Sequence, residues 1–217
     1  IGIANGLAWT SIGGETLPIE VQVMDNGSGK ITVTGSLGDV MKESAQLAVT
    51  YVRVHANEYG IDPERLKKCD LHIHAPEGAV PKDGPSAGVT LTTALVSCLS
   101  GIPVRGDVAM TGEITLHGNV LPIGGLREKS MAAYREGMKT VLIPKDNVSD
   151  LYEVDDEVKK NIQFLPMSNL AQVLNAALLK PKTVSARHSH PGKKTKKPAD
   201  AAAIPQTTEQ PKPGAVC

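Results

Sequence analysis

The sequence predicts an α+β fold in which one domain of mixed strand and helix order is followed by a tail. Short segments with alternating apolar residues, at 19–24, 30–34 and 70–74, have the two-residue period of half-buried strands. Apolar residues between 37 and 52 recur instead at the three- and four-residue steps of a helix. Hydrophobic residues make up 41% of the 217 positions, so the chain can bury a substantial core.

The first elements read as a hairpin followed by a helix. Ile19–Met24 and Lys30–Thr34 are separated by Asp25–Gly29, a run of turn-forming residues that favours a direct hairpin between the two strands. The helical period that follows, from Leu37 to Val52, continues until Gly60, which is expected to stop it. The stretch up to residue 60 therefore predicts two paired strands and one amphipathic helix.

After the strand at 70–74, residues 84–104 contain no charged side chain. Such a length approaches that of a membrane-spanning helix. However, the stretch contains Pro85, Pro103, three glycines and six Ser or Thr residues, which favour a loop that leads into a buried helix. We therefore expect no membrane association.

The remaining segments alternate between short strands and helices without a repeat. The expected strands lie at 107–111, 114–120, 140–143 and 162–165, and the expected helices at 126–138, near 148–160 and at 169–179.

The formal net charge of zero combines two unlike parts of the chain. Residues from Lys180 onward carry eight Lys or Arg and two Asp or Glu, so the preceding body is acidic. This C-terminal part holds six of the 15 prolines and no aromatic residue, and it cannot bury enough apolar surface to offset its chain entropy. We predict a folded domain at 1–181 and a disordered, basic, Pro-rich tail at 182–217.

Composition also limits the functional classes. Three cysteines are too few for a disulfide scaffold and indicate a reducing, cytoplasmic location. Six aromatic residues argue against a stacking platform for single-stranded nucleic acid. The basic run Lys193–Lys197 could contact DNA or an acidic surface, or be a solvated extension. Because the chain begins with Ile1 rather than Met, we expect it to be a fragment of a longer protein.

A serine between glycines and proline is the most informative local feature. In Pro81–Gly88, Ser86 opens an uncharged helix, and small neighbours allow a substrate backbone to approach it closely. Free N–H groups at a helix start, including that of Ser86, can stabilise an oxyanion. The alternative is that Ser86 only caps the helix. The stretch also fits G-x-S-x-G, but the Pro- and Gly-rich residues before it do not suit an α/β-hydrolase elbow.

A serine nucleophile needs a base, and two candidates are open. His72 and His74 lie two apart on one strand and face the same side, where they suit a triad or two ligands of a metal site. Lys129 shares a helix face with Leu126 and Ala133, and burial there would lower its pKa enough to make it a base. Spacing leaves open whether Lys129 is instead an ordinary surface lysine.

Several motifs together resemble the proteolytic domain of the Lon family of ATP-dependent proteases, in its soluble A-type form. The resemblance extends from near Gly6 to about Leu179. Its motifs are Gly6–Thr10, Gly35–Met41, Pro81–Gly88, Met110–Leu116, which is similar to a central strand pair of the family, and Leu121–Lys129.

The resemblance implies a Ser–Lys dyad, with Ser86 as nucleophile and Lys129 as base. It implies that Thr111 holds the lysine ammonium and that the backbone of Ser86 and Ala87 forms the oxyanion hole. The resemblance also implies that three further residues line or gate the site: Trp9, Glu77 and Asp83. His72 and His74 match a His-x-His pair of the family that is not catalytic. The resemblance therefore makes both a catalytic triad and a metal site less favoured interpretations of these histidines.

At the level of the whole protein, the resemblance implies a serine endopeptidase that degrades unfolded, misfolded and regulatory proteins in cytoplasmic quality control, as a homo-hexamer. ATP and Mg²⁺ would serve an ATPase module, and this chain has no G-x-x-x-x-G-K-[ST] motif. We therefore expect no cofactor or metal in the chain itself. Two alternatives are a ring-forming assembly module with a closed site and a nucleic-acid-binding adaptor that acts through the tail.

Overall fold

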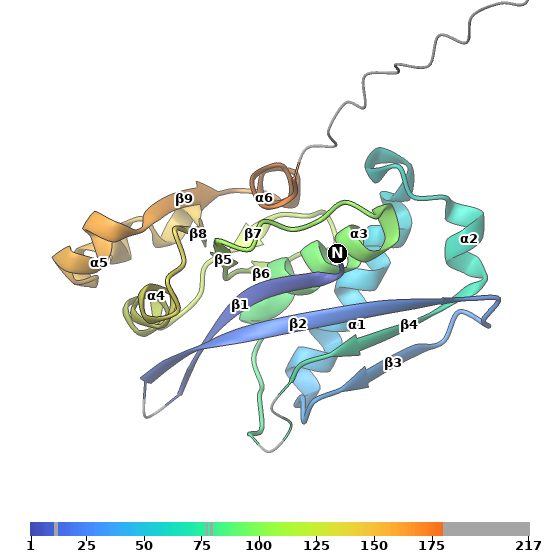
Figure 1. The fold of residues 1–217 in the computed structure, drawn as a ribbon, viewed down its shortest axis with the longest axis horizontal. Helices are drawn as coiled ribbons and strands as arrows, with labels where there is room; N and C mark the ends of the chain where they lie inside the picture. The colour runs from blue at the N-terminus through green and yellow to red at the C-terminus, as the bar shows by residue number, and fades with distance from the viewer. Residues whose placement is uncertain (11–12, 77, 79, 180–217) are drawn as a thin grey trace, which may run out of the picture. The chain divides into compact units, whose positions relative to one another are not determined.

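The computed structural model describes residues 1–10, 13–76, 78 and 80–179, and it confirms a mixed α/β architecture (Figure 1). A seven-stranded sheet has the order β3-β4-β2-β1-β5-β8-β9, and β6 and β7 form a separate pair. The strands are β1 (Ile3–Thr10), β2 (Gly13–Asp25), β3 (Ile31–Thr34), β4 (Cys69–His74), β5 (Val108–Met110), β6 (Glu113–Ile114), β7 (Val120–Leu121), β8 (Thr140–Pro144) and β9 (Gln163–Met167). The predicted tail lies outside the described residues, so the domain boundary stays a prediction.

Helices cover both faces of the sheet and create two apolar clusters. The larger cluster joins α1, α3 and α6 to β1, β2 and β4, and the smaller joins α4 and α5 to β1, β5 and β8. The α-helices are α1 (Asp39–Val54), α2 (Pro63–Lys67), α3 (Gly88–Ser100), α4 (Leu126–Arg135), α5 (Asp156–Asn161) and α6 (Leu170–Ala177). The 3₁₀ helices are η1 (Ala56–Tyr59), η2 (Pro85–Ala87), η3 (Lys145–Asn147) and η4 (Ser149–Glu153).

The uncharged stretch 84–104 forms η2 and the buried helix α3, as predicted. Two of the threonines that make α3 polar are satisfied within the helix, because Thr92 Oγ1 and Thr93 Oγ1 donate to backbone carbonyls four residues earlier, at 2.9 and 2.8 Å. Burial on all sides explains the absence of charge without a lipid environment. Among the described residues, no helix is long and apolar enough to cross a membrane.

The predicted hairpin between β2 and β3 is wrong, because β4 lies between them. Val21 on β2 pairs with Ile73 in antiparallel register, whereas Val33 on β3 pairs with Ile73 in parallel register. The connecting loop wraps around the start of β4: Asp70 Oδ1 accepts the N–H groups of Ser28 and Lys30 at 2.7 and 2.8 Å. The loop residues, which would suit a tight turn, therefore form a wider connection that passes β4 to reach β3. The carboxylate of Asp70, 40 residues after Lys30, holds this loop in place.

Three other elements differ from the predictions. Strand β1 was not predicted, yet it is the central strand of the main sheet. The expected strand at 114–120 is a small hairpin of β6 and β7 around Gly118, whose φ is +79°. Met110–Leu116 spans the last residue of β5, in the main sheet, and all of β6, in the small pair. The expected helix near 148–160 is divided into η4 and α5, because Val154 and Asp155 are extended.

Helix α4 approaches β2 so closely that the contact requires a glycine. A Cβ atom added to Gly14 would lie 1.9 Å from the backbone carbonyl oxygen of Glu128, and backbone cannot move aside as a flexible side chain can. Gly14 therefore sets the distance between the start of β2 and the helix turn that carries Lys129.

We predict that Gly14→Ala lowers stability by about 1–3 kcal/mol, because the added methyl group must push α4 off the sheet. Thermal or urea unfolding measures this loss. Gly106→Ala is the matched control: no atom lies within 4 Å of its added Cβ, and a change within about 0.5 kcal/mol is expected. Equal stability of the two variants would contradict the close approach.

Candidate active site

Ser86 lies in η2, at the point where the loop of residues 80–84 enters α3, and its side chain is half-buried. Gly84 precedes it with a φ of +127°, a conformation that other residues rarely adopt. The backbone carbonyl of Ser86 accepts the N–H of Gly112 at 2.8 Å and the hydroxyl of Thr111 at 3.4 Å. The serine is thus fixed to the segment that follows β5.

The structure brings Lys129 and Thr111 to the Ser86 hydroxyl. Lys129 lies on the buried face of α4, where its side chain is only 1% exposed. Its Nζ donates to Ser86 Oγ and to Thr111 Oγ1, each at 3.1 Å. Because the Thr111 hydroxyl in turn donates to the Ser86 carbonyl, the three residues form one connected hydrogen-bond network.

Burial lowers the pKa of Lys129 to about 8 from its ordinary value of 10.5. The physical cause is the loss of hydration, which penalises the ammonium form. No salt bridge among the described residues involves Lys129, so no carboxylate opposes this shift. A pKa near 8 leaves about one tenth of the amine neutral at pH 7, enough for it to accept a proton.

A cavity of about 410 Å³ opens beside the Ser86 and Lys129 side chains. The residues that line it are Ala8, Trp9, Leu17, Met41, Asp83, Gly84, Pro85, Ser86, Pro122, Ile123, Gly124 and Lys129. The Trp9 indole is 54% exposed and contacts Gly125, where an added Cβ would lie 2.5 Å from the ring. Trp9 therefore packs against the N-cap of α4, four residues before Lys129.

Asp83 also lines the cavity, and its contacts show what it does locally. Its Oδ1 accepts the N–H of Gly84 at 2.8 Å and that of Met41, in the first turn of α1, at 3.0 Å. The N-cap residue of α1, Gly38, has no side chain with which to cap the helix. Asp83 supplies that cap from a distant segment and so ties the serine loop to α1.

The other residues predicted from sequence lie elsewhere or were not described. Glu77 lies outside the described residues. Ala87 follows Ser86 in η2, in the first turn of the helical segment. His72 and His74 do not line the cavity; both bond the hydroxyl of Thr34, at 2.9 and 2.7 Å. The described residues contain no group of three or more His, Cys, Asp or Glu side chains that could hold a metal ion.

Sequence reasoning assigned no role in the site to half of the residues that line the cavity. Leu17 lies outside every motif, whereas Ala8, Met41 and Pro122–Gly124 lie in motifs that carry the family resemblance but have no reactive group of their own. An alternating strand or helix pattern marks such residues as core, and only the fold reveals that their side chains reach a cavity.

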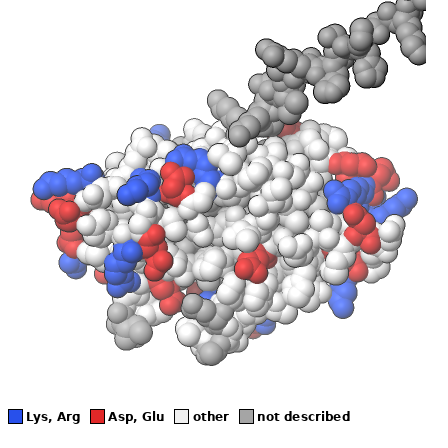
Figure 2. Space-filling model, viewed as in Figure 1, with Lys and Arg blue, Asp and Glu red and all other residues white. Residues whose placement is uncertain are grey.

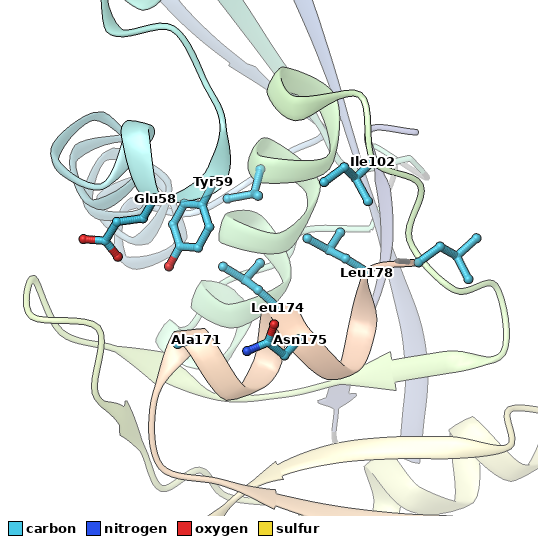
Figure 3. Close-up of a pocket in the computed structure, with 9 residues that line it drawn as sticks. Glu58, Tyr59, Ile102, Ala171, Leu174, Asn175 and Leu178 are labelled. Carbon is cyan, nitrogen blue, oxygen red and sulfur yellow. The ribbon is translucent and has the colours of Figure 1, made fainter. Parts of the chain in front are cut away.

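A second cavity, of about 360 Å³, lies between η1, α3 and α6 (Figure 3). Tyr59, Ile102, Leu174 and Leu178 surround it, so its walls are mainly apolar. No serine, cysteine, lysine or histidine is among its lining residues. Ser86 and Lys129, the amine with a lowered pKa, both line the first cavity, which is therefore the candidate active site.

Residues 1–180 match the family model described as the Lon protease (S16) C-terminal proteolytic domain. The chain belongs to the Lon protease family. The Lon protease of Brevibacillus choshinensis is 57% identical over 180 residues, which cover 83% of this chain and 23% of that relative. The Lon protease of Azorhizobium caulinodans is 52% identical over 205 residues, which cover 94% of this chain and 23% of that relative.

The chain therefore corresponds to the proteolytic domain of Lon proteases and spans about a quarter of the length of the curated relatives it matches.

Figure 2 shows one face of this Lon domain, on which basic and acidic side chains are mixed towards both ends and a broad area between them is largely uncharged. The described residues form no continuous basic surface on that face.

We predict that Lys129→Met stabilises the domain at pH 6.5 by about 1–3 kcal/mol, because the buried ammonium costs about 3 kcal/mol there. The folded pKa of Lys129 lies below its unfolded value, so the unfolded chain binds more protons between pH 8 and 10.5. The original chain should therefore regain stability relative to the variant as pH rises through that window. Urea unfolding at pH 6.5 and pH 10 measures the difference.

Lys139→Met is the control for this comparison, since Lys139 is exposed. Its effect on the free energy of unfolding should be the same at both pH values. If the Lys129→Met difference were equally independent of pH, the burial argument for a lowered lysine pKa would fail.

Proposed function

We propose that the chain is a serine endopeptidase domain in which Ser86 and Lys129 form a catalytic dyad. The observation that carries this proposal is the 3.1 Å contact between Ser86 Oγ and a lysine amine that is 1% exposed. A serine hydroxyl is a weak nucleophile until a base takes its proton, and a neutral amine with a pKa near 8 suits that task.

In the first step, the neutral amine of Lys129 accepts the hydroxyl proton while Ser86 Oγ attacks the peptide carbonyl carbon. The Thr111 hydroxyl accepts a hydrogen bond from the resulting ammonium and keeps its Nζ near Ser86. The ammonium then gives its proton to the leaving amine as the C–N bond breaks, which leaves an acyl-enzyme. Water, deprotonated by Lys129, hydrolyses the ester and restores the Ser86 hydroxyl.

Negative charge on the carbonyl oxygen needs donors in the first two steps. We assign this role to the backbone N–H groups of Ser86 and Ala87, in the first turn of the continuous helical segment Pro85–Ser100. The N-terminal turn of a helix carries positive partial charge and presents N–H groups to an anion. Trp9 and Asp83, which line the cavity, would then limit where a peptide enters.

The chemical character of the cavity favours an apolar substrate side chain. Ala8, Leu17 and Met41 form one part of its lining, and Pro122 and Ile123 form another. An apolar side chain buried there would be stabilised by roughly 1.5–3 kcal/mol, whereas a charged one would lose its hydration without a partner. We propose unfolded proteins and peptides as substrates, because only an extended chain can bring an internal apolar residue into such a cavity.

The relatives named above are about four times longer than the aligned region. We propose that this domain works within a longer cytoplasmic protein, where an ATPase module that uses ATP and Mg²⁺ delivers unfolded chains to a homo-hexamer. The DNA contact suggested for the basic tail remains a separate proposal. Alone, the domain is expected to cleave peptides and unfolded chains poorly.

We predict that a fluorophosphonate adds covalently to Ser86, and that Ser86→Ala abolishes the adduct. Lys129→Met should slow labelling at least about a hundredfold while the domain remains folded, because the base is lost. Intact mass and peptide mapping identify the adduct, and circular dichroism checks the fold. Ser149→Ala, at an exposed position, is the control. Undiminished labelling of Lys129→Met would refute the dyad.

We also predict that the rate of labelling rises about tenfold between pH 7 and pH 9 and then reaches a plateau. Only the neutral form of Lys129 can accept the proton, and a pKa near 8 places the rise in this interval. The second-order rate constant, measured at each pH, gives the apparent pKa. A flat profile across this interval would mean that the group that activates Ser86 is not this amine.

A further inference from the structure

Asn147 is a buried polar residue, 3% exposed, that clamps one wall of the active-site cavity. Its Oδ1 accepts the N–H of Ile123 at 2.9 Å, and its Nδ2 donates to the carbonyl of the same residue at 2.8 Å. The remaining Nδ2 hydrogen is directed to Asp150 Oδ2, at 2.6 Å. The carboxamide therefore uses both donors and its acceptor, and its orientation is fixed by the two backbone groups of Ile123.

The clamp matters because the wall has no strand beside it at this point. Strand β7 ends at Leu121, and Pro122–Gly124 continues as irregular backbone along the cavity. A buried N–H or C=O group without a partner is costly, and Asn147 offers Ile123 the same donor and acceptor that a neighbouring strand would. Asn147 itself ends η3, which follows β8 of the main sheet directly, so the clamp connects the wall to the most regular part of the fold.

We propose that Asn147 is a positioning residue for peptide binding: it holds Pro122–Gly124 at the place where that segment forms the wall that contacts the substrate chain. This inference rests on the proposed function. Asn147 does not line the cavity itself and acts only through Ile123. The base is held separately, because α4 packs on β2 through the close contact at Gly14. Loss of the clamp should therefore impair peptide recognition more than the reactivity of Ser86.

The test compares two reagents that both modify Ser86: a small fluorophosphonate with no peptide part, and a tripeptidyl diphenyl phosphonate with an apolar residue next to the phosphorus. The 217-residue chain and three variants are used. Asn147→Asp keeps the shape of the side chain but loses both donors and adds a charge beside Asp150. Asn147→Leu is similar in size and has no polar group. Asn161→Leu, an exposed asparagine at the end of α5, is the control.

For both Asn147 variants, we expect the second-order rate constant of the peptidyl reagent to fall about ten- to a hundredfold, the effect of losing one or two buried hydrogen bonds. The rate constant of the small reagent should change less than about threefold. With a fluorogenic peptide, KM should rise more than kcat falls. Asn161→Leu should match the original chain with both reagents. Circular dichroism and thermal unfolding confirm that a compared variant is folded.

An equal loss with both reagents would overturn the proposal, since Asn147 would then support the dyad or the whole fold. Unchanged rate constants with both reagents in a folded variant would also overturn it. If Asn147→Leu does not fold, the isosteric Asn147→Asp decides between these outcomes. If neither variant folds, Asn147 supports the whole fold, and the proposal is overturned. Failure of both reagents to label the original chain at Ser86 would instead refute the proposed function, and the peptide-binding role with it.

Discussion

The burial of the Lys129 amine is the constraint on which the arrangement of the site depends. Lys129 is 1% exposed, and its amine bonds two hydroxyl groups of the described residues, so it has lost most of its hydration, which lowers its pKa to about 8. That burial is unfavourable by about 3 kcal/mol while the amine is charged, and the rest of the fold must offset it. The aliphatic clusters on both faces of the sheet provide this stabilisation.

The position of the amine is set mainly by backbone contacts. Gly112 donates its N–H to the Ser86 carbonyl and accepts the N–H of Val89, so the start of α3 is joined to the segment after β5 by two hydrogen bonds. Thr111 lies in the same segment, and its N–H is bonded to the carbonyl of Leu142 on β8. Ser86 and the Thr111 hydroxyl that contacts Lys129 are therefore both connected to the main sheet. On the other side, the close contacts at Gly14 and Gly125 fix the helix that carries Lys129.

The sequence predicts those features that depend on local pattern. The helices at 37–52 and 169–179 and the buried helix after Ser86 follow from apolar periodicity and the absence of charge, and the structure confirms them. The pairing of β2 with β4 could not be predicted, because it joins residues far apart in the chain, as does the contact of Asp70 with the loop before β3. The same limit holds for the site. Ser86 stands out locally, whereas the burial of Lys129 and the roles of Thr111 and Asp83 depend on long-range packing that only a family resemblance could suggest.

The proposed binding of extended chains would place two opposing requirements on the site. An extended chain can pair with backbone that is not already paired on that side, and the proposed role of Pro122–Gly124, which lines the cavity, depends on such backbone. Irregular backbone next to a buried amine, however, leaves N–H and C=O groups that need partners on the opposite side. A buried carboxamide meets that need within a single residue, because it pairs with both groups of Ile123 and leaves the other edge of the segment open. The asparagine after β8 thus holds the wall from one side with a single side chain, in place of the neighbouring strand that would otherwise pair with Ile123.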